Sequence, residues 1–115
     1  MEITGIGVDI ETIDKFKNKE YKKNRDFYSK IFSTNEINYC LAKIDSYMSF
    51  AGKFCAKEAV VKALKKNNLF SLANIEIINN EAGQPEAFMN AKKIDCFLSI
   101  AHGDTTAIAF CVLYT

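Results

Sequence analysis

The chain has 115 residues, of which 49% are apolar and 25% are charged. These proportions are typical of a globular protein with a hydrophobic core, and the length suits a single domain over residues 1–115. The 15 basic and 14 acidic residues leave a net charge of +1, which argues against bulk affinity for nucleic acid.

The cysteines and the apolar runs exclude further classes of protein. The four cysteines form no CxxC pair and only one histidine is present, so a zinc finger is excluded and buried, reduced thiols are expected. No apolar run reaches membrane length, and the N-terminal segment lacks the pattern of a signal peptide. We therefore expect a cytoplasmic protein with no membrane partner.

The first predicted element is a strand over residues 2–10. Because side chains alternate along a strand, its two faces carry different residues. One face holds Ile6, Val8 and Ile10, and the other holds Gly5, Gly7 and Asp9. The glycine face leaves room for a ligand or for a closely packed helix.

Helices are expected next. Residues 11–30 are charged with an apolar side and are predicted to be helical in pieces. Ser33 and Glu36 form a capping-box pattern ahead of a helix that ends at about Lys43.

A longer helix follows, with Asp45 or Ser46 as its N-cap and its end at about Lys65. The asparagines at 67–68 suit the exit from this helix.

After the long helix the periodicity changes to two. Strands are predicted at residues 74–79, 86–89, 95–101 and 106–114. Residues 80–85 form a turn, and residues 102–105 are typical of a hairpin connection. The order predicts an α+β fold in which a long helix packs on an antiparallel sheet.

Residues 50–64, FAGKFCAKEAVVKAL, place a carboxylate among apolar residues. At 100° per residue Glu58 lies about 40° from the centre of the apolar stripe at Phe54. Since a buried, unpaired carboxylate is unfavourable, Glu58 either faces a cleft or meets a cation. One interpretation is an i,i+4 ion pair with Lys62, worth roughly 0.2–0.5 kcal/mol on an exposed face.

The second interpretation adds Asp9, which also suits a simple helix cap after its strand. Two carboxylates brought together from distant elements repel each other unless a cation joins them. Oxygen ligands of this kind suit Mg²⁺, and neighbouring lysines suit a phosphorylated substrate.

Four segments together resemble the holo-acyl-carrier-protein synthase family, the small bacterial 4′-phosphopantetheinyl transferases. They are residues 5–10 (GIGVDI), residues 50–64, residues 79–85 (NNEAGQP) and residues 98–102 (LSIAH). The match follows the family order and spacing over nearly the whole chain.

The resemblance implies a reaction and a metal. Such enzymes move 4′-phosphopantetheine from coenzyme A to a serine hydroxyl of acyl carrier protein, in support of fatty acid biosynthesis, and release adenosine 3′,5′-bisphosphate. Asp9 and Glu58 match the family's Mg²⁺ ligands. Glu58, directly or through a metal-bound water, is the expected route for the serine proton.

The resemblance also implies contacts to coenzyme A. Lys62 matches a phosphate contact, and His102 matches a histidine that contacts the pyrophosphate, although a histidine at a hairpin is otherwise simply exposed. Gly83, Gln84 and Pro85 match a turn near the nucleotide of a neighbouring subunit. The family forms homotrimers with active sites between subunits, so a homotrimer is expected.

An acidic carrier protein should meet a basic surface with apolar anchors. The segment 15–30 offers six cations with Phe16 and Phe27 between them, which are otherwise read as a solvated helix face. The residues predicted to bind the carrier protein are Lys15, Lys22, Arg25 and Phe27.

The chain departs from the family at three places. Lys15 and Lys53 stand where the family usually has arginine, which removes bidentate contacts to the carrier protein and to the coenzyme phosphates respectively. Lys53 is still predicted to bind the coenzyme. Residues 65–67 are Lys-Lys-Asn where the family commonly has Gly-Thr-Gly, so the loop near the nucleotide differs.

Two other functions stay open on these residues. The altered 65–67 loop suits a module that binds coenzyme A or the carrier protein without turnover. A structural α+β domain, in which Glu58 and Lys62 form only an ion pair, needs no chemistry at all.

Overall fold

A computed structural model of the chain describes residues 1–65 and 72–115. Its strands are β1 (Ile3–Thr12), β2 (Ile75–Asn79), β3 (Pro85–Met89), β4 (Lys92–Lys93), β5 (Cys96–His102) and β6 (Thr106–Tyr114). Its helices are α1 (Asp14–Lys17), α2 (Arg25–Ile31), α3 (Thr34–Leu41) and α4 (Ser46–Leu64), with short 3-10 turns at Tyr21–Lys23 and Leu72–Asn74.

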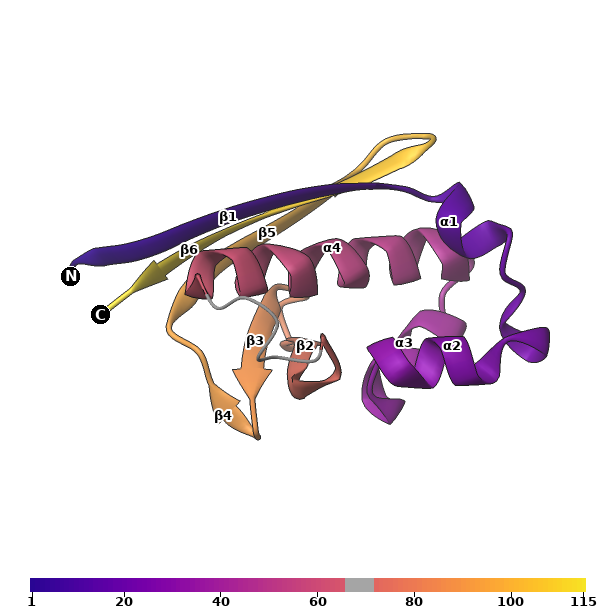
Figure 1. Cartoon of the computed structure of the whole chain (residues 1–115), viewed down its shortest axis with the longest axis horizontal. Helices are drawn as coiled ribbons and strands as arrows, with labels where there is room; N and C mark the ends of the chain where they lie inside the picture. Colours follow the sequence, from indigo (N-terminus) through magenta and orange to yellow (C-terminus); the bar gives the residue numbers. More distant parts are fainter. Residues whose placement is uncertain (66–71) are drawn as a thin grey trace.

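The strands form two antiparallel sheets, in the orders β1-β6-β5 and β2-β3-β4. The predicted α+β class and the long helix on an antiparallel sheet are confirmed (Figure 1). The sequence did not predict the division into two sheets, nor the two-residue strand β4, which is too short to show a periodicity.

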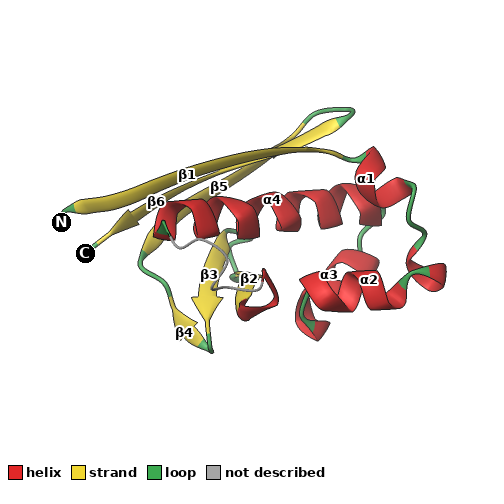
Figure 2. Ribbon diagram, in the orientation of Figure 1, coloured by secondary structure: helices red, strands yellow, loops and turns green. Residues whose placement is uncertain are grey.

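Helix α4 is the centre of the fold. Strands β1, β5 and β6 cover one side of it, α3 and β2 pack against it from the other, and α1 lies near its N-terminal end (Figure 2). Every residue from Phe50 to Lys57 is buried. The expectation of a single apolar stripe was therefore wrong, and Glu58 lies among apolar residues because this stretch has almost no solvent-facing side.

The glycines of β1 let this strand lie directly on α4. A Cβ atom at Gly5 would collide with the carbonyl oxygen of Ala63, and one at Gly7 would collide with that of Ala59. The space predicted on this face of the strand is thus filled by a helix backbone.

The opposite face of the β1-β6-β5 sheet carries large apolar side chains that are exposed in the single chain. The larger ones include Ile6 at 62%, Val8 at 50%, Ile10 at 62%, Phe97 at 56%, Ile108 at 41% and Phe110 at 46% relative exposure. The register pairs Val8 with Phe110 and Ile10 with Ile108, so these side chains form one continuous surface, which we call the apolar sheet face.

The helix ends follow the predicted caps. Both halves of the capping box between Ser33 and Glu36 are present, and Asp45 accepts from the backbone N–H of Met48 to cap α4. Helix α4 ends at Leu64, and its C-cap residue Lys65 has a left-handed φ of 56°. The exit predicted at residues 67–68 lies outside the described residues.

Two predicted absences concern membranes and disulfides. Over residues 1–65 and 72–115, no helix combines the length and the apolarity that crossing a bilayer requires. All four cysteines are free thiols, and three of them are buried, as expected.

Candidate active site

Asp9, Glu58 and Lys62 come together where β1 crosses α4. The strand contacts Ala63 through Gly5 and Ala59 through Gly7. Two strand residues advance about 6.6 Å and four helix residues about 6 Å, so the two elements stay in step. Two residues further along the strand, Asp9 therefore lies one helical turn before Ala59, next to Cys55. It is also close enough to Glu58 for their charges to interact.

Lys62 pairs with Asp9 and not with Glu58. Its Nζ lies 3.0 Å from Oδ1 of Asp9 and 3.1 Å from the carbonyl oxygen of Val8. Across the described parts of the chain no ion pair joins Glu58 to Lys62, so the interpretation of a simple i,i+4 pair was wrong. The hydrogen bond to Asp9 raises the pKa of the Lys62 ammonium.

Glu58 is half-buried and electrostatically unfavourable when charged. Burial, followed by the negative charge of Asp9, raises the pKa of Glu58, and Lys62 offsets only part of this effect. Among the described residues no side chain or backbone group donates a hydrogen bond to the Glu58 carboxylate. Within that part of the chain, the site therefore holds a carboxylate that lacks a cation of its own.

Asp9 also has an unused oxygen. Its side chain is 8% exposed, and Oδ2 is buried without a hydrogen-bond donor in the described residues. The neighbouring thiol of Cys55 donates its one hydrogen to the carbonyl oxygen of Ala107, and burial together with Asp9 raises the pKa of Cys55 to about 12. Asp9 does not cap α1 either, because the N-cap position is Ile13.

The donor set fits a hard divalent cation. Oδ2 of Asp9 and the Glu58 carboxylate are oxygen donors in need of positive charge, which is what Mg²⁺ or Mn²⁺ requires. Within the described chain no cluster of three His, Cys, Asp or Glu residues is present. A cation held here would thus take its remaining ligands from water or from a substrate.

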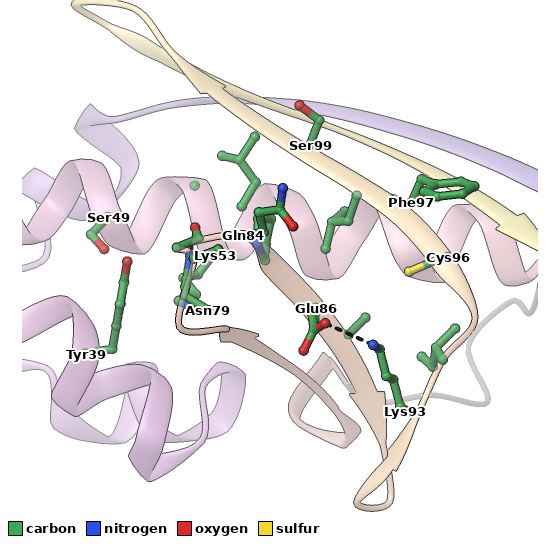
Figure 3. Close-up of a pocket in the computed structure, with 18 of the residues that line it drawn as sticks. Tyr39, Ser49, Lys53, Asn79, Gln84, Glu86, Lys93, Cys96, Phe97 and Ser99 are labelled. Carbon is green, nitrogen blue, oxygen red and sulfur yellow. Dashed lines mark hydrogen bonds and ion pairs between the residues drawn. The ribbon is translucent and has the colours of Figure 1, made fainter.

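A pocket of about 690 Å³ lies on another side of α4, between this helix, the β2–β3 turn and β5 (Figure 3). Of the residues predicted to bind coenzyme A, five line it: Lys53, Gly83, Gln84, Pro85 and His102. Asp9, Glu58 and Lys62 do not. The pocket volume is in the range of small-molecule and cofactor sites.

His102 and the β2–β3 turn are placed by two glycines. A Cβ atom at Gly52 would collide with Nε2 of His102, so this glycine lets the histidine lie on the helix. Gly83 has a φ of +83°, which glycine adopts without strain, and open space surrounds it.

Lys53 is 4% exposed and is bonded within the protein. Its Nζ donates to the carbonyl oxygen of Ile77 at 2.7 Å and to Oδ1 of Asn79 at 2.6 Å. Burial lowers the pKa of this lysine.

Within one chain, the predicted catalytic residues thus fall into two separate groups. Glu58 comes six residues after Gly52, the glycine that contacts His102, which corresponds to about 9 Å along the helix and about 240° around it. The carboxylates and Lys62 form one half-site, and the pocket with His102 forms the other.

The predicted carrier-binding residues lie near α1 and α2. Lys22, Arg25 and Phe27 line a shallow depression of about 380 Å³. Lys15 is held by Glu11 at 3.3 Å and lies 4.0 Å from the centroid of the Phe54 ring.

The prediction that Phe16 is an apolar anchor on this surface was wrong. Phe16 is 0% exposed and packs in the core against the rings of Phe50 and Phe54. In the sequence Phe16 stands between Lys15 and Lys17, but in α1 its side chain is the buried one.

Comparison with known proteins decides the family. Residues 5–111 match the family described as the 4′-phosphopantetheinyl transferase superfamily. The chain belongs to this superfamily. A holo-[acyl-carrier-protein] synthase of Thermodesulfovibrio yellowstonii is 38% identical over 111 residues, which cover 96% of this chain and 98% of that protein.

Solved structures of phosphopantetheinyl transferases share the fold. The holo-(acyl-carrier-protein) synthase from Bacillus anthracis in complex with CoA (3′,5′-ADP) has a TM-score of 0.81 at 30% identity, covering 98% of this chain and 97% of that one. The Helicobacter pylori enzyme in complex with coenzyme A has a TM-score of 0.81 at 27% identity, covering 95% of this chain and 99% of that one.

Sequence reasoning missed a buried ion pair in this phosphopantetheinyl transferase. Nζ of Lys57 lies 2.5 Å from Oε1 of Glu36, and both side chains are 0% exposed. Oε2 of Glu36 also accepts the backbone N–H of Ile77 at 2.7 Å. The available signal was a second lysine, besides Lys53, within the largely apolar stretch that precedes Glu58.

Proposed function

We propose that the protein transfers 4′-phosphopantetheine from coenzyme A to a serine hydroxyl of apo acyl carrier protein, in support of fatty acid biosynthesis. The observation that carries the proposal is the pair of under-compensated carboxylates at the family positions, Asp9 with its unpartnered Oδ2 and Glu58 with its raised pKa. The relatives named as synthases, and the structures in complex with coenzyme A, support it.

Asp9 and Glu58 would hold Mg²⁺. When bound, the ion would neutralise charge on the pyrophosphate of coenzyme A and on the departing bisphosphate. Two carboxylates that repel each other in its absence are suited to this ion, because binding removes the repulsion.

The transfer forms a bond from the serine oxygen to the phosphorus nearest pantetheine and breaks the pyrophosphate P–O bond. Adenosine 3′,5′-bisphosphate leaves with the bond electrons, and the serine proton passes to Glu58. Lys62, half exposed on a flexible stem, is placed to exchange its bond to Asp9 for a phosphate oxygen.

Coenzyme A would bind between copies of the chain, with Gly83, Gln84, Pro85 and His102 of one copy facing the carboxylates of the next. Two observations support assembly of copies of the chain: the separation of the half-sites within one chain, and the exposed apolar sheet face. The resemblance to the family implies that the copies number three. Light scattering should give three times the chain mass of 13.0 kDa. A monomer that is active at the same concentration would contradict this part of the proposal.

Carrier protein would dock at the depression beside α2. Lys22 and Arg25 supply positive charge, and Phe27 supplies an apolar contact beside them. Replacing both cations with glutamate should raise the KM for carrier protein and leave the KM for coenzyme A unchanged.

The test is to incubate the protein with coenzyme A, Mg²⁺ and several apo acyl carrier proteins, and to weigh each carrier by mass spectrometry. We expect a gain of one phosphopantetheine that requires the divalent cation. Tight binding of coenzyme A without any mass gain would instead identify a binding module and would overturn the proposal.

A further inference from the structure

Lys53 is buried and uses its ammonium group mainly inside the protein. A lysine ammonium carries three donors. Two are used by the carbonyl oxygen of Ile77 and by Oδ1 of Asn79, at 2.7 and 2.6 Å, and the Tyr39 ring, with its centroid 4.2 Å from Nζ, covers a further side. With 4% of the residue exposed, the ammonium is enclosed by these partners.

The bonds of Lys53 lead to the β2–β3 turn. Asn79 accepts from Lys53 through Oδ1 and donates through Nδ2 to the carbonyl oxygen of Gly83 at 3.1 Å. It is also the last residue of β2 and is paired with Pro85 of β3. A continuous path of hydrogen bonds therefore joins α4 to the turn.

The turn also has hydrogen bonds of its own, which shape the loop. Oδ1 of Asn80 accepts from the backbone N–H groups of Ala82 and Gln84, and the backbone N–H of Gly83 donates to the carbonyl oxygen of Asn80. These bonds fix the loop on itself. Of the hydrogen bonds in the described residues, only the path through Lys53 and Asn79 ties this turn to α4.

We propose that Lys53 is a positioning residue that holds the turn of Gly83, Gln84 and Pro85 against α4, and that it does not bind a phosphate of coenzyme A. The proposal rests on the proposed function insofar as this turn forms part of the coenzyme pocket. It replaces the prediction from sequence that Lys53 contacts the coenzyme phosphates.

Binding of a coenzyme phosphate by Lys53 would disrupt its hydrogen bonds within the protein. A phosphate that displaced either hydrogen-bond partner of Lys53 would leave the Ile77 carbonyl or the Asn79 amide oxygen without its donor. Burial also lowers the pKa of Lys53, because the enclosed position disfavours the charged form relative to water. Lys62, by contrast, is half exposed and keeps its charge.

The first test compares two ligands, 3′,5′-ADP and AMP, which differ by one phosphate. Lys53→Met, Asn79→Ala and the double variant are titrated with each ligand by calorimetry. If Lys53 positions the turn, both single variants weaken both ligands by a similar factor, roughly tenfold. The affinity ratio of the two ligands then stays unchanged, and the double variant is no weaker than the weaker single one.

The second test needs no ligand. Hydrogen exchange at the Gly83 and Gln84 amides should accelerate in Lys53→Met and in Asn79→Ala, because the internal bonds of the turn open more often once its tie to α4 is lost. Exchange in β6 should stay slow. This readout separates the two proposals: a protein that binds neither ligand contradicts the proposed function, whereas exchange in the turn still decides the role of Lys53.

Lys43→Met is the matched control, because Lys43 also lies on the Tyr39 ring, at 4.6 Å, but has no bond to the turn. It should change neither affinity nor exchange. The proposal is overturned if Lys53→Met weakens 3′,5′-ADP alone, or if turn exchange stays at the wild-type rate. Should Lys53→Met fail to fold, Asn79→Ala decides by the same two measurements.

Discussion

Lys57 and Glu58 are neighbours on α4, yet their surroundings are opposite. Lys57 is fully buried against Glu36, whose two oxygens also accept the backbone N–H groups of Ser33 and Ile77. Glu58 is half-buried, is repelled by Asp9 and accepts no hydrogen bond from the described residues.

The difference separates structure from function. A fully buried polar group that is paired within the protein is shielded from a ligand, and its role is to fix the fold. A carboxylate that is left under-compensated beside another one keeps that capacity. By this criterion Lys57, Glu36 and Lys53 are structural, whereas Asp9, Glu58 and Lys62 form the reactive half-site.

The largest expected effect is on turnover. Asp9→Asn and Glu58→Gln should each lower kcat by at least about a hundredfold, because each removes a cation ligand and the second also removes the base. Circular dichroism should show an unchanged fold. Wild-type turnover in either variant would sink the assignment of this half-site.

The next largest effect is the loss of stability that follows replacement of Lys57, the residue beside Glu58. Lys57→Met leaves the buried Glu36 carboxylate without its cation and should lower the free energy of unfolding by about 3–5 kcal/mol. Urea denaturation measures the change. Lys23→Met, which removes an exposed ion pair with Glu20, is the control and should cost about 0.5 kcal/mol or less.

A smaller effect is expected where β1 lies on α4. Gly7→Ala drives a methyl group into the carbonyl oxygen of Ala59, and since a helix backbone yields little, we expect a loss of about 1–3 kcal/mol. Turnover should fall as well, because Asp9 moves with the strand. Gly103→Ala has only ordinary contacts at 3.6 Å and beyond, so it should keep wild-type stability.

The smallest predicted effect is a gain in stability. Because the pKa of Glu58 is raised by folding, its ionised form destabilises the native state above the ordinary glutamate pKa. Glu58→Gln should therefore melt slightly higher than wild type at neutral pH without metal. The gap should close as the pH falls through the folded-state pKa of Glu58 towards its unfolded value. A gap that widens on acidification would refute burial and the charge of Asp9 as its cause.

Local pattern sufficed for much of the fold. The capping box at Ser33 and Glu36, the Asp45 cap and the period-two strands are all determined by residues close in sequence, and they were predicted within a few positions. The burial of α4 on nearly all sides was not, because it depends on a second sheet that packs against the far side of the helix.

The candidate site was predicted as a set of residues but not as an arrangement. The family pattern named Asp9, Glu58 and His102 together, and the chain places His102 on another side of α4. The partners of Lys53 were equally out of reach, because its bonds cross 24 and 26 residues of sequence and carry no periodic signal.

The most direct test uses Glu58→Gln, with transfer and stability measured in the same sample. Apo acyl carrier protein is weighed under conditions in which the wild type converts all of it, and the urea midpoint is recorded without metal. The account requires almost no converted carrier and a midpoint at or above that of the wild type. Full conversion, or a midpoint that falls as far as that of Lys57→Met, would contradict it.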